Sequence, residues 1–198
     1  MSGNMFFTSD LHFGHDREFI WGPRGFKSVD EMNEVLVRNW NDTVDKNDII
    51  YVLGDFFLGP INSQYIHHMI TELNGKIHFV RGNHDTPAKM KIYTEDPLID
   101  VEGYATMLSY TNILEKKKTR QFYLSHFPTM TATLESNPDT AIYNLFGHTH
   151  SKEKFYEGRP YMYNVAVDAH NNRPVSIDEI MRDIDNEIIK CYSLLGEQ

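Results

Sequence analysis

The sequence predicts an α/β fold formed by a single domain over residues 1–198. Short apolar runs alternate with stretches of helical periodicity, which is the pattern of strands that alternate with helices. No internal repeat, low-complexity segment or linker divides the chain. A content of 40% hydrophobic and 13% aromatic residues is enough for a packed core.

Strands and helices alternate in the first half of the chain. Apolar runs predict three buried strands, at Met5–Thr8, Asp48–Leu53 and Ile77–Val80. Ser28-Val29-Asp30-Glu31 is a capping box, so a helix should begin there and bury one apolar face. A second helix is expected over Ile61–Leu73, and Asn74-Gly75 should end it.

Strands dominate the second half. They are predicted at Tyr104–Ile113, Gln121–Ser125, Ala141–Phe146, Phe155-Tyr156 and Tyr161–Val167. The first two should pair as a hairpin around a solvated connection at Glu115–Arg120. The last two flank the turn sequence Glu157–Pro160. A second capping box, Ser176–Glu179, predicts a helix that runs to Ile189.

The composition narrows the possible functions. A formal net charge of −9 argues against strong nucleic-acid binding, whose affinity comes mostly from Lys and Arg contacts to phosphates. The single cysteine, Cys191, leaves no partner for an internal disulfide and fits a reducing compartment. No signal-peptide pattern opens the chain, and no apolar run approaches the roughly 20 residues that span a bilayer. We therefore expect a cytoplasmic enzyme without membrane contact, in an oligomeric state that the sequence leaves open.

Five short polar motifs each follow a hydrophobic run. They are Asp10-Leu11-His12, Gly54-Asp55, Gly82-Asn83-His84-Asp85, Ser125-His126 and Gly147-His148-Thr149-His150. In open α/β sheets, ligands bind beyond the carboxyl ends of the strands, so the five motifs should meet at one place. Four imidazoles, two carboxylates and one carboxamide suit two divalent ions of borderline or hard character.

The motif residues have different expected roles in such a site. Asp10 and His12 are two residues apart, so in an extended segment both side chains face the same way and can grip one ion. Asp55 can place one carboxylate oxygen on each of two ions. Asn83 offers a neutral oxygen, which keeps the negative charge low. The remaining expected ligands are His126, His148 and His150.

His84 is the motif histidine that does not belong to this ligand set. It follows Asn83 directly, so its ring should point elsewhere, and an imidazole beside a leaving oxygen suits general acid catalysis. Two divalent ions would hold a phosphate and lower the pKa of a bridging water. We expect the resulting hydroxide to attack phosphorus in line while His84 protonates the leaving oxygen.

All five motifs in this order resemble those of the calcineurin-like metallophosphoesterase superfamily, from Asp10 to His150. The resemblance implies a four-layer α/β/β/α sandwich with a di-metal site at the strand carboxyl ends, and His84 as the catalytic histidine. It also implies two overlapping ligand sets, Asp10, His12, Asp55 and His150 for one ion and Asp55, Asn83, His126 and His148 for the other. The chain most resembles small single-domain bacterial and phage members.

The expected function is metal-dependent hydrolysis of a small phosphoester or nucleotide, as a phosphodiesterase or nucleotide phosphohydrolase. Mn²⁺ is the expected ion, and Fe, Ni or Zn are alternatives because the same donors suit them. Gly54-Asp55 lacks the second Asp and the Arg found in protein Ser/Thr phosphatases of the superfamily. Two rivals stay open: a nuclease acting on DNA or RNA, and a noncatalytic protein-binding scaffold of the same fold.

Four further residues near the motifs have two interpretations each. His15 either contacts substrate phosphate or holds its own turn. Arg24 contacts phosphate or, as we favour, belongs to an ordinary surface loop. Arg81 reaches phosphate or, as we favour, pairs with a surface acid. Asp85 orients the histidine before it or, as we favour, caps the next helix.

Overall fold

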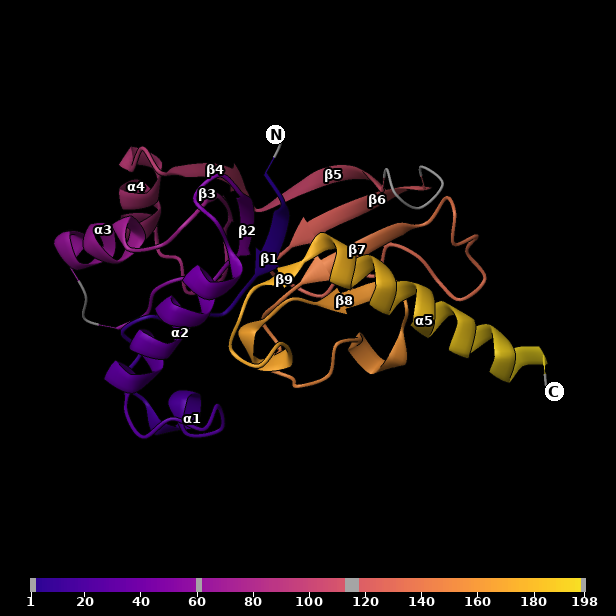
Figure 1. The fold of residues 1–198 in the computed structure, drawn as a ribbon, viewed down its shortest axis with the longest axis horizontal. Helices are drawn as coiled ribbons and strands as arrows, with labels where there is room; N and C mark the ends of the chain where they lie inside the picture. The colour runs from indigo at the N-terminus through magenta and orange to yellow at the C-terminus, as the bar shows by residue number, and fades with distance from the viewer. Residues whose placement is uncertain (1–2, 60–61, 113–117, 197–198) are drawn as a thin grey trace.

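Two mixed β-sheets flanked by helices form the described part of the chain (Figure 1). This computed structural model describes residues 3–59, 62–112 and 118–196. Helices α2, α3 and α4 lie beside the first sheet, and α5 runs along the second (Figure 1). The predicted α/β class, with helices outside two sheets, is confirmed.

The first sheet has the strand order β4-β3-β2-β1-β9. Its strands are β1 (Met5–Thr8), β2 (Ile49–Leu53), β3 (Lys76–Val80), β4 (Ile99–Gly103) and β9 (Val175–Ser176). β1 to β4 pair in parallel, whereas β9 is antiparallel to β1. The apolar runs of β1 to β3 fit a sheet that is covered on both faces.

Four helices belong to this half of the fold. They are α1 (Glu18–Trp21), α2 (Val29–Thr43), α3 (Ser63–Thr71) and α4 (Pro87–Glu95). The predicted cap of α2 is confirmed, because Ser28 Oγ accepts a hydrogen bond from Glu31 N at 3.1 Å. Leu36 and Trp40 of α2 pack with Ile66 and Ile70 of α3 in a core that covers one face of the sheet.

The second sheet has the order β5-β6-β7-β8. Its strands are β5 (Ala105–Asn112), β6 (Lys118–Ser125), β7 (Ile142–Phe146) and β8 (Met162–Asn164). β5 and β6 form the predicted antiparallel pair, and β6, β7 and β8 are parallel. Two short 3-10 helices, Tyr156–Gly158 and Val167–Ala169, flank β8.

Helix α5 (Ile177–Gly196) packs against the second sheet. Arg120 of β6 pairs with Asp185, and the Tyr163 hydroxyl donates to Asp183 at 2.6 Å. A second core joins this sheet and α5 to Phe7 on the opposite face of the first sheet. Within the described ranges, no helix is long and apolar enough to cross a membrane.

Some predicted boundaries are wrong. Lys118–Arg120 belong to β6 rather than to the predicted connection Glu115–Arg120. Residues 113–117, which include the start of that connection and the predicted strand end Ile113, lie outside the described part. Phe155 makes a single bridge to Tyr163 and starts no strand. α5 continues past Ile189 to Gly196.

Two further differences concern the first half of the chain. Ile61, the predicted start of a helix, lies outside the described residues, and α3 begins at Ser63 after its cap Asn62. β4 was not predicted, although its alternation of apolar and acidic residues fits a strand at the edge of the sheet.

The topology brings the ends of five strands together. β1, β2 and β3 are parallel, so their carboxyl ends share one edge of the first sheet. β6 and β7 are likewise parallel, and their ends meet where Gly147 N donates to the His126 carbonyl at 3.0 Å. A bridge between Ser9 and Ala166 joins the two sheets at this edge. The polar motifs therefore lie on adjacent loops.

Candidate metal centre and its cleft

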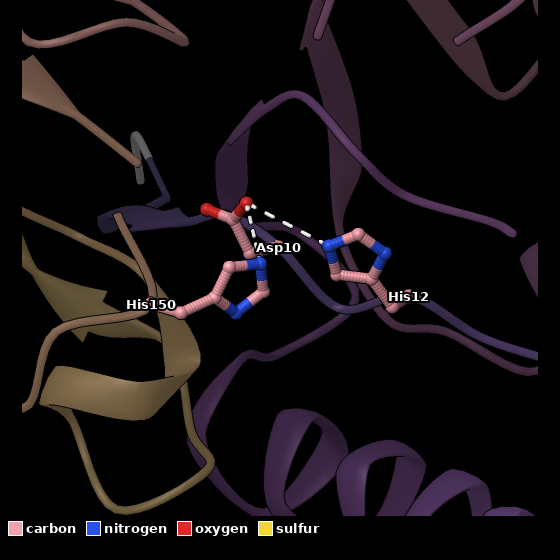
Figure 2. Close-up of side chains that lie close together, drawn as sticks. All are labelled: Asp10, His12 and His150. Carbon is pink, nitrogen blue, oxygen red and sulfur yellow. Dashed lines mark ion pairs between the residues drawn. The ribbon is translucent and has the colours of Figure 1, made fainter. Parts of the chain in front are cut away.

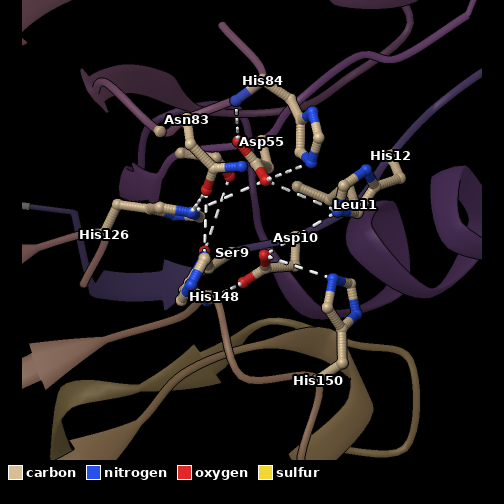
Figure 3. Close-up of polar contacts among 12 residues, drawn as sticks. Ser9, Asp10, Leu11, His12, Asp55, Asn83, His84, His126, His148 and His150 are labelled. Atoms are coloured by element: carbon tan, nitrogen blue, oxygen red, sulfur yellow. Dashed lines mark hydrogen bonds and ion pairs between the residues drawn. The ribbon is translucent and has the colours of Figure 1, made fainter. Parts of the chain in front are cut away.

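Residues from all five motifs meet at this edge (Figure 3). Two groups of side chains bring potential ligand atoms within 4.8 Å of one another, Asp10, His12 and His150 in one and Asp10, Asp55 and His126 in the other. Asp55 Oδ2 lies 3.7 Å from His12 Nε2 and 3.5 Å from His126 Nε2. One carboxylate oxygen of Asp55 thus lies between the two sides of the site.

Asp10, His12 and His150 form the side that we call the inner group (Figure 2). Asp10 Oδ1 lies 3.8 Å from His12 Nε2 and 3.7 Å from His150 Nε2. The side chains of Asp10 and His12 are 0% and 2% exposed, and that of His150 is 34% exposed. Both rings present a nitrogen to the same carboxylate oxygen.

Asn83, His126 and His148 form the outer group. Asn83 Oδ1 lies 2.8 Å from His126 Nε2 and 3.0 Å from His148 Nδ1. His126 Nδ1 donates to the Leu53 carbonyl at 2.8 Å, so its Nε2 presents a lone pair to an oxygen that also carries only lone pairs. Asn83 and His148 are exposed, unlike His126.

His84 lies beside both groups. Its backbone N donates to Asp55 Oδ1 at 2.9 Å, which fixes the loop after β3 against the loop after β2. Its Nε2 is 4.0 Å from Asp55 Oδ2, and its side chain is 47% exposed. The ring therefore stands at the mouth of the site, in contact with the carboxylate and open to a ligand.

Five of the seven predicted ligands have a left-handed backbone. Their φ angles range from 49° to 69°, for Asp10, His12, Asp55, His148 and His150. The segment that holds Asp10 and His12 is therefore not extended as we expected, although the two side chains do converge. Such backbone conformations are costly for residues other than glycine and concentrate at functional sites.

Glycines allow the loops to approach one another. A Cβ on Gly147 would lie 2.0 Å from Ser9 Oγ and 2.2 Å from Asp10 Oδ2. A Cβ on Gly82 would lie 2.3 Å from Asp55 Oδ1. Only residues without a side chain fit where the motifs touch, which explains the glycine that precedes Asn83 and the one that precedes His148.

The donors present fit a divalent cation. Asp10 Oδ1 and both ring nitrogens of His12 are buried and have no hydrogen-bond partner among the residues that the structure describes, and such groups are normally paired. Burial alone would raise the pKa of Asp10, yet the neighbouring imidazoles of His12, His126 and His150 hold that pKa well below its usual range. Burial lowers the pKa of His12, which favours the neutral ring that binds metals.

Arg24 and Asp168 support the inner group, and sequence reasoning missed this role for both. Arg24 Nε and Nη2 each donate to Asp168 at 2.9 Å, and Nη2 also donates to the Asp10 carbonyl at 2.7 Å. Asp168 Oδ2 lies 3.1 Å from His150 Nδ1, so that nitrogen can donate to it while Nε2 faces Asp10. Arg24 is 9% exposed, so the favoured surface-loop interpretation is wrong. No local sequence pattern links Arg24 with Asp168, because 144 residues separate them.

Asp85 and Arg81 also have other partners than we predicted. The Asp85 carboxylate is buried and accepts hydrogen bonds from Gly82 N at 2.7 Å and Asp55 N at 2.9 Å. It does not cap α4, which Thr86 does, and within the described residues it forms no hydrogen bond or ion pair with the His84 ring. Arg81 donates to the Asp85 carbonyl and to the Tyr104 hydroxyl, and pairs with no described acid.

A cleft of 880 Å³ opens over the site. His12, Asp55, Asn83, His84, His148 and His150 line its floor, and the loop and helix after the first motif form a wall. His15 belongs to this wall, with its ring 5.5 Å from that of His12. Burial lowers the pKa of His15 to about 4, so its ring is neutral near pH 7.

Comparisons with known proteins agree with this arrangement. The model of the calcineurin-like phosphoesterase family matches residues 4–191. An uncharacterized protein of Methanocaldococcus jannaschii is 32% identical over 185 residues, which cover 91% of each chain. The gene 66 protein of Mycobacterium phage D29 is 30% identical over 202 residues, which cover 93% of this chain and 97% of the phage protein.

A solved structure supports the fold as well. The crystal structure of a protein of unknown function from Aquifex aeolicus superposes with a TM-score of 0.61 at 22% identity. The match covers 91% of this chain and 98% of that one, and at this identity it shows a shared fold alone. The family that the five motifs predicted is confirmed by the family match over nearly the whole chain. The chain belongs to the calcineurin-like phosphoesterase family.

Proposed function

We propose that this chain is a metal-dependent phosphoester hydrolase that acts on phosphodiesters or nucleotides, as one domain over residues 1–198. One observation carries the proposal: buried, unpaired ligand atoms of Asp10 and His12 converge with Asp55 beneath an open cleft. The proposed ligands are Asp10, His12, Asp55 and His150 for one ion and Asp55, Asn83, His126 and His148 for the other.

The ions would supply what the side chains alone lack. Divalent cations provide positive charge for the phosphate oxygens and activate water as a nucleophile near neutral pH. We take Mn²⁺ as the expected ion, because the carboxylate and carboxamide oxygens suit it, and Fe, Ni or Zn as alternatives, because the imidazoles suit them. The chain itself contributes rigid placement of the donors and a walled cleft that positions the ester, in which Asp55 touches both sides of the site.

His84 is the proposed general acid. Hydrolysis forms one P–O bond to water and breaks the P–O bond to the leaving group, which departs as an alkoxide that needs a proton. The His84 ring lies at the mouth of the site, and Nε2 faces Asp55 Oδ2. A proton held at Nε2 can pass to the leaving oxygen, because an imidazole carries and releases protons near neutral pH.

The test replaces the acid and keeps the ligands. We expect His84→Ala to lower the turnover of a dinucleoside monophosphate, whose leaving alkoxide needs a proton, by about 10²- to 10⁴-fold, the usual contribution of general acid catalysis. Metal content, measured by mass spectrometry after reconstitution with Mn²⁺, should equal that of the wild type. His68→Ala, on the exposed surface of α3, is the matched control and should change neither quantity.

Two results would count against the proposal. A wild-type chain that hydrolyses no phosphoester with Mn²⁺, Fe²⁺, Ni²⁺ or Zn²⁺ would favour a noncatalytic scaffold. An unchanged turnover in His84→Ala would show that His84 is not the general acid, while the proposed hydrolase activity would stand.

A further inference from the structure

The wall of the cleft contains an aromatic side chain that the proposed chemistry does not use. Phe19 of α1 lines the cleft together with His15 and the floor residues His12 and His84. Its side chain is 69% exposed. A single exposed aromatic residue is ordinary on a protein surface, so its meaning depends on what surrounds it.

Phe19 extends a row of rings that starts at the floor of the site. The His12 and His15 rings are 5.5 Å apart, and the His15 and Phe19 rings are 5.7 Å apart at an interplanar angle of 88°. This edge-to-face contact leaves most of the Phe19 ring accessible. The row of rings therefore runs from His12, a candidate metal ligand, through His15 to the exposed ring of Phe19.

The short helix α1 holds Phe19 in place. Ile20, the next residue, is 8% exposed and belongs to the core beside the first sheet. Gly22 N donates to the Glu18 carbonyl at 2.8 Å and closes the turn. Because Ile20 is anchored inside, Phe19 is directed outward into the cleft on a fixed backbone.

With the proposed metal ions at its floor, the cleft also suits an anion larger than phosphate, although Asp16 and Asp55 line it. Its volume of 880 Å³ falls within the range of about 300–1,000 Å³ for sites that bind organic ligands. Arg17 is the only Lys or Arg among the described residues that line it, and in the described ranges its guanidinium forms no ion pair or hydrogen bond. A free cation and an open ring that line the same cleft match a ligand that combines negative charge with a flat apolar group.

We propose that Phe19 is a stacking platform for the base of a nucleoside phosphoester, whose phosphate lies over the floor of the same cleft. The inference rests on the proposed function and specifies its substrate class. Stacking on an aromatic ring tolerates every base, since each has a π-face. The platform therefore selects nucleotides against phosphoesters of aliphatic alcohols and does not select one base.

Two esters with the same leaving group isolate this effect. Thymidine 5′-p-nitrophenyl phosphate and ethyl p-nitrophenyl phosphate both release p-nitrophenolate and differ in the group that stays on phosphorus. We expect Phe19→Ala and Phe19→Leu to lower kcat/KM for the thymidine ester by about 5- to 100-fold, mainly through KM. The ethyl ester should keep its kcat/KM, and Phe19→Trp should retain the preference because it restores a ring.

A binding measurement separates the platform from turnover. AMP binding to the Mn²⁺-loaded protein, followed by calorimetry, should weaken at least about 5-fold in Phe19→Ala, whereas inorganic phosphate should bind as before. Tyr192→Leu, at a partly exposed aromatic residue of α5, is the matched control and should leave AMP binding unchanged.

The outcomes distinguish the two proposals. If Phe19→Ala slows both esters equally, or if AMP binding does not change, the platform is wrong while the hydrolase stands. If the wild type hydrolyses no phosphoester, neither these two diesters nor a nucleotide, the proposed function is wrong, and AMP binding alone then decides whether Phe19 recognises a base.

Discussion

The inner and outer groups of the site contain similar donors in different surroundings. In the inner group, Asp10 and His12 are almost completely buried, and Arg24 and Asp168 support His150 from behind. In the outer group, Asn83 and His148 are exposed. Only His126 is buried there, and the Leu53 carbonyl holds its ring.

This difference bears on how strongly each group should bind a cation. Buried ligand atoms such as Asp10 Oδ1 and His12 Nε2 cannot be satisfied by bulk water, and leaving each of them unpaired costs about 1–3 kcal/mol. Exposed donors such as Asn83 and His148 can be hydrated instead. A cation therefore removes more of this cost at the inner group than at the outer group. We expect the two ions to bind with unequal affinities, and the ion held by Asp10 to bind more tightly.

The largest effect should come from exchanging one ligand in each group. We expect Asp10→Asn to lose the ion that binds more tightly. Diester turnover should fall by more than roughly 100-fold, which is the upper effect of removing a residue that only supports a metal ligand. Asn83→Ala should lose the weaker ion and keep the tighter one. Mn²⁺ titration with mass-spectrometric counting of bound metal measures both. Equal loss of both ions in the two variants would contradict the distinction between the groups.

Convergence of the motifs was predictable because it follows from topology. Parallel neighbouring strands share their carboxyl ends, so Asp10, Asp55 and Asn83 had to emerge at one edge once β1, β2 and β3 were recognised. The cap of α2 was predictable for a local reason, since Ser28 and Glu31 interact within one turn.

The supports behind the ligands were not predictable. Arg24 and Asp168 are 144 residues apart in the sequence, and no local pattern links them. Asp85 binds the backbone of Asp55 and Gly82, a contact that depends on how two loops meet. The left-handed backbone at the ligands is also imposed by the surrounding packing, because the residue types themselves disfavour it.

A smaller effect should come from the residues behind the inner group. Asp168→Asn weakens the hydrogen bond that orients His150 and leaves the buried Arg24 without its ion pair. We expect the affinity of the tighter Mn²⁺ to fall about 10- to 100-fold and that of the weaker ion to remain. The control Asp183→Asn removes an acid of α5 that pairs with Lys154. It should lower the free energy of unfolding without changing the affinity for either ion. If Asp168→Asn weakened the outer ion instead, Asp168 would not act through His150.

The smallest expected effect is thermal. A ligand at 100 times its Kd stabilises the folded state by about 2.7 kcal/mol. For a chain of this size each kcal/mol raises Tm by about 2–4 °C. Because the buried donors belong to the inner group, most of the rise should occur at the low Mn²⁺ concentrations that fill the tighter site. Calorimetry of metal-stripped protein across an Mn²⁺ series should show this early rise in the wild type and in Asn83→Ala, but not in Asp10→Asn. A rise that appeared only at the higher concentrations, where the second ion binds, would assign the tighter binding to the exposed side of the site.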